Sequence, residues 1–219
     1  RRSSDLMIIE KKKQGGQERI DVYIVGKDYD DVKLSSVLNK KLKRNQISHI
    51  ISSDADVFTE DGKVLLRFRK NKLTQQKMDA FYENVIDFAS RTTTNRGSAT
   101  GGIKGTKSVA SNPKIMTNII GFFDRMSPRQ KFIAKQQGKS LKTEVRECMF
   151  NMDNPDKFVQ LIPLVKEIDG FYRKYMPDKY KCQRKKADQT HFKIAGTSFT
   201  TITTNVNFQT TVHMDKGDD

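Results

Sequence analysis

The chain has 219 residues, and its 41 Lys and Arg residues against 26 Asp and Glu give a formal net charge of +15. No run approaches the roughly 18 apolar residues of a membrane span, which excludes an integral membrane protein. The N-terminus lacks a signal-peptide core, and two cysteines alone form neither a disulfide framework nor a zinc site. We therefore expect an intracellular protein, in the cytoplasm or the nucleus.

The positive charge favours a polyanion as partner, and nucleic acid is the commonest polyanion. Any single basic cluster is more often a solvated surface, but four clusters together favour a binding face. Charge alone does not separate DNA from RNA, or either from packing inside a virion. The residues that we assign to a nucleic-acid backbone contact come from two of the clusters: Lys70, Lys72, Arg184, Lys185 and Lys186.

The sequence of the N-terminal third predicts an unstructured arm, two short strands and one helix. Residues 1–19 are polar and indicate an arm with little structure of its own. Strands are predicted at 20–25 and 64–69, and a basic helix at 35–46. In the second strand Leu66 and Phe68 alternate with basic residues, which is typical of a half-exposed strand.

Two long amphipathic helices dominate the rest of the prediction. The first covers 75–90 with Thr74 as N-cap, and the second covers 155–176, with Pro163 inside it and Pro177 ending it. Between them we expect a long Gly/Ser/Thr loop at 91–112, a strand at 116–123 and a helix from 127 to 138. A basic connection at 178–195 then leads into β-rich sequence at 197–212.

The one pattern that suggests chemistry is His213-Met214-Asp215. In a strand, residues i and i+2 point to the same side, so this His and Asp can bind one metal ion together. They would be two of the three ligands in the 2-His-1-carboxylate triad of non-haem Fe(II) oxygenases. The pattern by itself is short, and a surface hydrogen bond is the simpler interpretation.

A longer pattern surrounds this motif and resembles a known family. Residues 196–218 read GTSFTTITTNVNFQTTVHMDKGD, which is similar to the TET/JBP family of Fe(II)- and 2-oxoglutarate-dependent dioxygenases. Three pieces upstream look similar as well, in the same order: Phe68-Arg69-Lys70-Asn71, Thr94-Asn95-Arg96-Gly97 and Ile119-Ile120-Gly121-Phe122-Phe123-Asp124. The resemblance runs from about residue 63 to the last residue.

This resemblance implies oxidation of the 5-methyl group of a pyrimidine in DNA, either 5-methylcytosine or thymine, with Fe(II) and 2-oxoglutarate as cofactors. It makes His213 and Asp215 metal ligands and places Asp218 against the target base. A turn-capping role fits Asp218 equally well. Asn95 and Arg96 would line the base pocket or bind a phosphate, whereas the simpler interpretation is an ordinary turn before a glycine.

In that family most of the barrel follows the HxD motif, including the second metal His and the Arg that binds 2-oxoglutarate. We therefore expect neither residue within this chain, which leaves open whether the chain itself is an enzyme. The predicted fold is α+β, an incomplete double-stranded β-helix (jelly-roll) flanked by the long helices. The predicted division is a basic N-terminal extension over 1–60 and the first part of the dioxygenase domain over 61–219.

Two functions remain open from the sequence. The chain is either the N-terminal part of a DNA-modifying dioxygenase, or a non-catalytic nucleic-acid-binding or viral structural protein on a truncated dioxygenase scaffold, which would be virion-associated. An open sheet edge would favour a protein partner that covers it.

Overall fold

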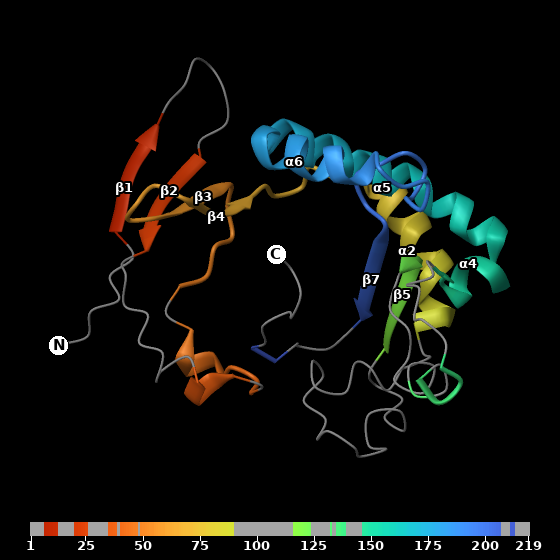
Figure 1. Ribbon diagram of the computed structural model, residues 1–219. Coiled ribbons are helices and arrows are strands. Elements are labelled where there is room, and N and C mark those ends of the chain that lie inside the picture. Colours follow the sequence, from red (N-terminus) through yellow and green to blue (C-terminus); the bar gives the residue numbers. More distant parts are fainter. Residues whose placement is uncertain are drawn as a thin grey trace. The chain divides into compact units, whose positions relative to one another are not determined.

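The computed structural model describes residues 7–12, 20–25, 35–38, 40–47, 49–89, 116–123, 132, 135–138, 146–206 and 211–212. The chain divides into two compact units (Figure 1). The first unit comprises Arg1–Lys72, Gly97–Gly105 and Gln209–Asp219, and the second comprises Leu73–Arg96 and Thr106–Phe208.

The first unit contains a four-stranded sheet in the order β1-β2-β3-β4. The strands are β1 (Met7–Lys12), β2 (Ile20–Val25), β3 (Ala55–Thr59) and β4 (Val64–Phe68). The outer pairs are antiparallel, whereas β2 and β3 are parallel. The strands predicted at 20–25 and 64–69 are confirmed, but the expectation of little structure over 1–19 is wrong where β1 lies. The first half of β1 is apolar and the second half is charged, and pairing with β2 gives both halves backbone partners.

The basic helix predicted over 35–46 is also wrong in extent. Only residues 35–37 are helical, and a short 3-10 turn, η1 (Arg44–Gln46), follows the extended residue Lys43. Like charges at Lys40 and Arg44, four residues apart, would repel each other along one face of a continuous helix.

The antiparallel pair β3–β4 turns at Gly62, whose φ of 78° lies in the left-handed region that favours glycine. Alternating residues of β3, Ala55 and Val57, are buried. Two basic residues, Arg67 of β4 and Arg69 just after it, face a carboxylate on β3. Arg69 Nη2 lies 2.8 Å from Asp56 Oδ1, and Arg67 Nε lies 3.7 Å from Asp56 Oδ2.

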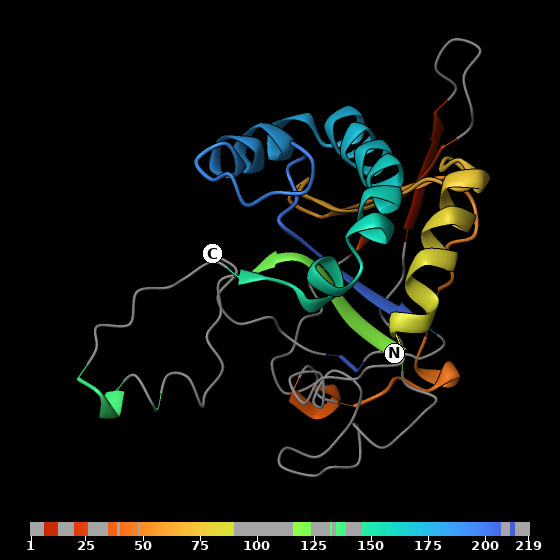
Figure 2. The same cartoon turned by 90° about the vertical axis from the view of Figure 1, so that its right-hand side faces the viewer.

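The second unit packs helices against a three-stranded sheet in the order β6-β5-β7 (Figure 2). Its helices are α2 (Gln75–Ala89), α4 (Met149–Asp153), α5 (Pro155–Tyr175) and α6 (Pro177–Ala187), and its strands are β5 (Met116–Phe123), β6 (Arg146–Glu147) and β7 (Thr201–Val206). The two long helices predicted from periodicity are confirmed as α2 and α5, and the strand predicted at 116–123 is confirmed as β5.

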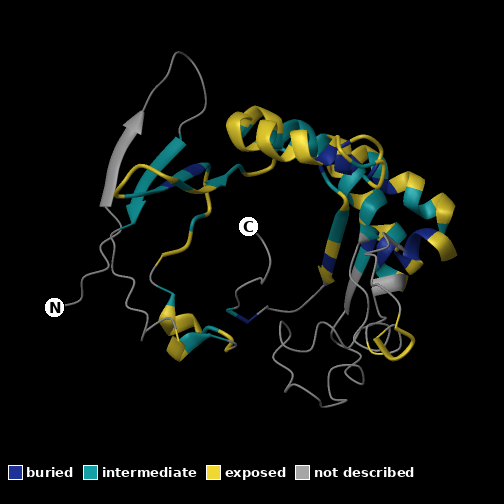
Figure 3. Ribbon diagram, in the orientation of Figure 1, coloured by how far each residue is buried: buried dark blue, intermediate teal, exposed yellow. Residues whose placement is uncertain are grey.

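One buried cluster joins these elements. Val85 of α2, Ile120 of β5, Phe150 of α4 and Leu161 of α5 are each at most 3% exposed, and Phe81 and Phe158 pack against them. Burying each such side chain stabilises the fold by about 1.5–3 kcal/mol. Figure 3 shows this buried interior between the helices and β5. The α+β class is confirmed, while the described sheets are small and do not show a jelly-roll.

The segment after α5 differs from the prediction. Pro177 ends one helix but is also the first residue of α6, so the first ten residues of the expected connection over 178–195 are helical. Proline suits the first helical position because its missing N–H would have no partner there. The strand predicted over 197–212 is confirmed only for β7.

Thr74 precedes α2, and its carbonyl oxygen accepts hydrogen bonds from the backbone N–H groups of Lys77 and Met78, at 3.1 Å each. Its hydroxyl and its backbone N–H both donate to Glu167 Oε1 of α5, at 2.9 and 3.0 Å. Lys77 Nζ lies 3.0 Å from Glu167 Oε2, so one carboxylate fastens the start of α2 to α5. Within the described ranges, none of the helices combines the length and apolarity of a bilayer-spanning segment.

Candidate functional site

The residues predicted to bind metal and base lie outside the described part of the chain. These are His213, Asp215, Asp218, Asn95 and Arg96. Among the described residues, no group of three or more His, Cys, Asp and Glu side chains could hold a metal ion. The structure does describe β7, which lies within the family-like pattern, and all five residues assigned to a nucleic-acid backbone contact.

Strand β7 is antiparallel to β5, with Met116 opposite Val206 and Gly121 opposite Thr201. Gly121 has a φ of 104°. A Cβ atom there would collide with the carbonyl oxygen of Thr200 and would lie 3.1 Å from Ile194 Cδ1. Only glycine allows the two strands to approach so closely. The N–H of Phe122 donates to that same Thr200 oxygen at 2.8 Å.

A buried amide also holds Gly121. The Asn151 side chain is 2% exposed, and its Oδ1 accepts the Gly121 N–H at 3.0 Å. Asn151 Nδ2 donates to the Gly121 carbonyl oxygen at 3.2 Å, and the backbone N–H of Cys148 donates to the same oxygen at 2.9 Å. The side chain thus replaces strand hydrogen bonds where β5 departs from regular geometry.

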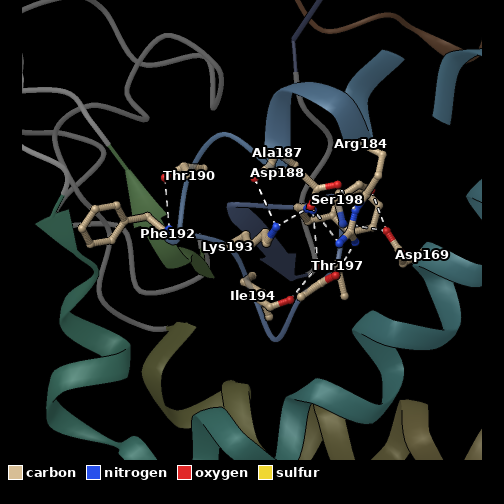
Figure 4. Close-up of polar contacts among 12 residues, drawn as sticks. Asp169, Arg184, Ala187, Asp188, Thr190, Phe192, Lys193, Ile194, Thr197 and Ser198 are labelled. Atoms are coloured by element: carbon tan, nitrogen blue, oxygen red, sulfur yellow. Dashed lines mark hydrogen bonds and ion pairs between the residues drawn. The ribbon is translucent and has the colours of Figure 1, made fainter. Parts of the chain in front are cut away.

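The residues just before β7 are tied to α5 by a carboxylate (Figure 4). Asp169 Oδ1 accepts hydrogen bonds from the N–H and the hydroxyl of Ser198, at 2.8 and 2.6 Å. Its other oxygen accepts the Tyr180 hydroxyl of α6 at 3.0 Å, and Gln183 Nε2 donates to the Ser198 carbonyl oxygen at 3.1 Å. Two helices therefore fix the backbone three residues before β7 begins.

A second set of polar contacts involves Arg184, a residue that the sequence analysis expects to contact a nucleic-acid backbone. Its guanidinium donates to the Gly196 carbonyl oxygen, and its Nη2 lies 2.9 Å from Asp188 Oδ1. Lys193 Nζ lies 2.6 Å from the same Asp188 oxygen (Figure 4). Hydrogen bonds from Arg184 first, and from Lys193 next, lower the pKa of the Asp188 carboxyl, and Asp188 in turn raises the pKa of Arg184. Arg184 is thus engaged inside the protein, whereas Lys185 and Lys186 are exposed.

In the first unit, Lys70 and Lys72 both lie near Asp54. The backbone N–H of Lys70 donates to Asp54 Oδ1 at 2.7 Å and leaves its side chain in an exposed position. Lys72 Nζ lies 3.8 Å from Asp54 Oδ2, and its side chain is 24% exposed. Of these two residues, Lys70 is the better placed to meet an external phosphate.

The residues that position β7 carried little signal in the sequence. Asp169 lies on an amphipathic helix, where an acidic residue ordinarily faces solvent. Asn151 lies in the segment 143–151, whose sequence is compatible with either a helix or a strand. Gly121 belonged to one of the family-like pieces, and its role as a point of close strand approach emerges only from the pairing with β7.

The C-terminal part of the chain matches a protein family. Residues 134–219 match the Tet_JBP model, the oxygenase domain of the 2OGFeDO superfamily, which confirms the resemblance inferred from the sequence. The match includes α5, α6, β7 and the HxD motif.

Several trypanosomatid proteins are similar to this chain. "Bifunctional helicase and thymine dioxygenase JBP2" of Leishmania braziliensis is 35% identical over 103 residues, which are 47% of this chain and 8% of that protein. The protein of the same name from Trypanosoma cruzi is 29% identical over 186 residues, 78% of this chain and 15% of that protein. "Thymine dioxygenase JBP1" of Crithidia fasciculata is 28% identical over 103 residues, 47% of this chain and 11% of that protein.

The chain thus spans only a small fraction of the length of these curated relatives. No solved structure matches the chain.

Proposed function

We propose that this chain is part of an Fe(II)- and 2-oxoglutarate-dependent dioxygenase that oxidises the 5-methyl group of a pyrimidine base in DNA. The observation that carries the proposal is the match of residues 134–219 to the oxygenase family. The relatives named as thymine dioxygenases favour thymine as the base, with 5-methylcytosine as the alternative.

His213 and Asp215 would hold the iron. An imidazole and a carboxylate suit Fe(II), and a third ligand from the protein would complete one face of the coordination sphere. Held there with 2-oxoglutarate, the metal would supply O₂ activation. One oxygen atom would go to the methyl group and the other to succinate, with CO₂ released from 2-oxoglutarate. His49 and His191, the two described histidines, are exposed, and we do not assign either as the third ligand.

Three further residues would contact the DNA base or backbone in this proposal. The Asp218 carboxylate would accept a hydrogen bond from an exocyclic amine or a ring N–H of the base. Asn95 and Arg96 would line the base pocket or bind a phosphate. Lys70 would contact the DNA backbone, and Lys72 would do so if it exchanged its carboxylate partner for a phosphate.

Fold completion is part of the same proposal. We expect β5, β6 and β7 to contribute to a double-stranded β-helix whose other strands lie in the remainder of the enzyme, or to a sheet that a protein partner covers. Strand edges of a small sheet need such a cover, because unpaired backbone groups otherwise pair with other chains.

The test uses the natural full-length protein with duplex DNA that contains thymine or 5-methylcytosine, plus Fe(II), 2-oxoglutarate and O₂. We expect a 5-hydroxymethyl nucleoside and an equal amount of succinate by mass spectrometry. His213→Ala and Asp215→Ala should each abolish both products, because removal of a facial ligand loses metal affinity and the fixed orientation of the cofactor. His191→Ala is the matched control and should leave both products unchanged.

Unchanged turnover in Asp215→Ala would refute the dioxygenase proposal. A second candidate function, a nucleic-acid-binding protein without catalysis, is favoured by the exposed lysines of α6, which lie apart in sequence from the HxD motif. The relatives reported above give no support to a viral structural role, since their names are those of enzymes. DNA binding with no oxidised base and no succinate in the wild type would favour the non-catalytic function.

A further inference from the structure

The end of α5 and the whole of α6 are strongly basic. Residues 173–187 contain seven Lys and Arg side chains, and Asp178 is the one acidic residue among them. Arg184 is engaged internally, and the other six basic residues are exposed and form what we call the α5–α6 basic face: Arg173, Lys174, Lys179, Lys181, Lys185 and Lys186. Figure 3 shows α6 as a mostly exposed helix.

Helical geometry separates the lysines of α6 from its inward residues. Successive residues turn by about 100°, because a helix has 3.6 residues per turn. Tyr180, Arg184 and Ala187 therefore share one side, and their contacts are internal: Tyr180 donates to Asp169, Arg184 binds Gly196 and Asp188, and Ala187 is 6% exposed. Lys185 and Lys186 lie on the opposite side, and Lys179 and Lys181 lie on its two flanks.

Nearby carboxylates do little to offset this charge. Asp188 is paired with both Arg184 and Lys193. Asp169 already accepts three hydrogen bonds from Ser198 and Tyr180. Both carboxylates thus have partners that hold the loop before β7, so the exposed lysines leave a net positive surface.

We propose that the α5–α6 basic face binds the phosphate backbone of duplex DNA. The inference rests on the proposed function, and it identifies the surface of this unit that would track the substrate. Lysine ammonium groups on flexible stems act as point charges that suit phosphates, and their contacts carry no sequence information. Lys181 and Lys185 lie about 6 Å apart along the helix, at roughly 1.5 Å per residue, so both can reach one strand.

The composition of the face favours the phosphate backbone of DNA over an acidic protein as its ligand. Stable protein interfaces usually contain buried apolar or aromatic anchors inside a polar rim. The large hydrophobic residues of this segment, Tyr175, Met176 and Tyr180, are only partly exposed, and none of them is among the exposed large hydrophobic residues of the protein. Within this segment, Arg184 is paired with Gly196 and Asp188, whereas its neighbours Lys185 and Lys186 are exposed.

A native cysteine provides the first test. Cys182 is exposed in the middle of the face, whereas Cys148 is 4% exposed, and the chain has no other cysteine. Iodoacetamide should therefore label Cys182 selectively in the folded protein. We expect saturating duplex DNA to slow this labelling at least fivefold by mass spectrometry, and 1 M salt to remove the protection, since phosphate contacts release counterions.

A charge-matched pair of variants provides the second test. Lys185→Gln with Lys186→Gln removes two lysines from the face, and Lys63→Gln with Lys157→Gln removes two lysines elsewhere. Lys63 pairs with Asp61, and Lys157 lies 3.9 Å from Asp87. The slope of log affinity against log salt is negative, and each lost phosphate contact reduces its magnitude by about 0.9. The first pair of substitutions should therefore reduce the magnitude by about 1.8. The control pair should leave the slope unchanged.

The outcomes separate this inference from the proposed function. If DNA binds and is oxidised while Cys182 labelling and the salt slopes stay unchanged, the basic-face inference is wrong and the dioxygenase proposal stands. If Cys182 is protected and the slopes shift but no base is oxidised, the basic-face inference stands and the dioxygenase proposal is wrong. Protection by polyglutamate but not by duplex DNA would overturn the inference in favour of an acidic protein partner.

Discussion

Substitution of Gly121 by alanine should destabilise the second unit more than any other glycine change in it. The new Cβ would collide with the Thr200 carbonyl oxygen, which is itself bonded to the Phe122 N–H and cannot move away freely. A left-handed backbone costs a non-glycine residue about 1–3 kcal/mol, and overpacking costs about 1–3 kcal/mol more. The expected loss in unfolding free energy is therefore about 2–6 kcal/mol.

Substitutions at two other glycines distinguish the cost of the left-handed backbone from the cost of the steric collision. Gly196 has a φ of 74° with nothing within 4 Å of an added Cβ, so Gly196→Ala should show the backbone cost alone, about 1–3 kcal/mol. Gly170 lies inside α5 with open space around it, and Gly170→Ala should stabilise by about 0.5–1 kcal/mol. Urea unfolding followed by circular dichroism measures all three. A Gly121→Ala variant no less stable than Gly196→Ala would refute the argument from close strand approach.

Three further changes test the packing of the second unit. Asp169→Asn should cost about 1–3 kcal/mol in urea unfolding, because it weakens the acceptor of three hydrogen bonds, whereas the exposed Asp178→Asn should change stability by less than about 0.5 kcal/mol. Phe150→Ala should cost about 3–5 kcal/mol by the same measurement, since Phe150 is fully buried. The hydrogen bond from Lys77 lowers the pKa of the Glu167 carboxyl in the folded protein. The stabilisation from Glu167 is therefore complete above the ordinary carboxyl pKa of about 4.3. It is lost as the pH falls through the lower pKa of the folded state. Thermal melts between pH 6 and pH 3 should therefore show a shallower acid decline for Glu167→Gln; an unchanged decline would exclude this ion pair as a contributor.

Periodicity predicted the long elements and missed those that depend on partners. The apolar stripes of α2 and α5 are local properties of their sequences, so both helices were predicted nearly to their observed ends. β1 was missed because its short apolar stretch stands among charged residues, and its partner strand β2 lies further along the chain. α6 was missed because its lysines and weak apolar face resemble a connection, and its packing depends on Tyr180 and Ala187.

The candidate site was likewise predictable from the sequence only in part. The HxD motif and the longer pattern around it are readable from residue types and spacing, and residues 134–219 do match the oxygenase family. The internal role of Arg184 could not be predicted, because Gly196 meets Arg184, and Lys193 meets its partner Asp188, only after the chain turns back from α6. A run of basic residues gives their charge but not the direction in which each one points.

The pairing of β5 with β7 has a consequence for the order of folding. Residues 124–200 separate these strands, 77 residues in all, whereas only residues 60–63 separate β3 from β4. Each doubling of a flexible loop adds roughly 0.6 kcal/mol to its closure entropy, so the longer connection costs about 2.5 kcal/mol more. Contacts between distant segments generally form slowly for this reason. The hairpin β3–β4 should therefore acquire amide protection early in refolding, and β7 should acquire it only after α5 and α6 have collapsed together and shortened the effective search.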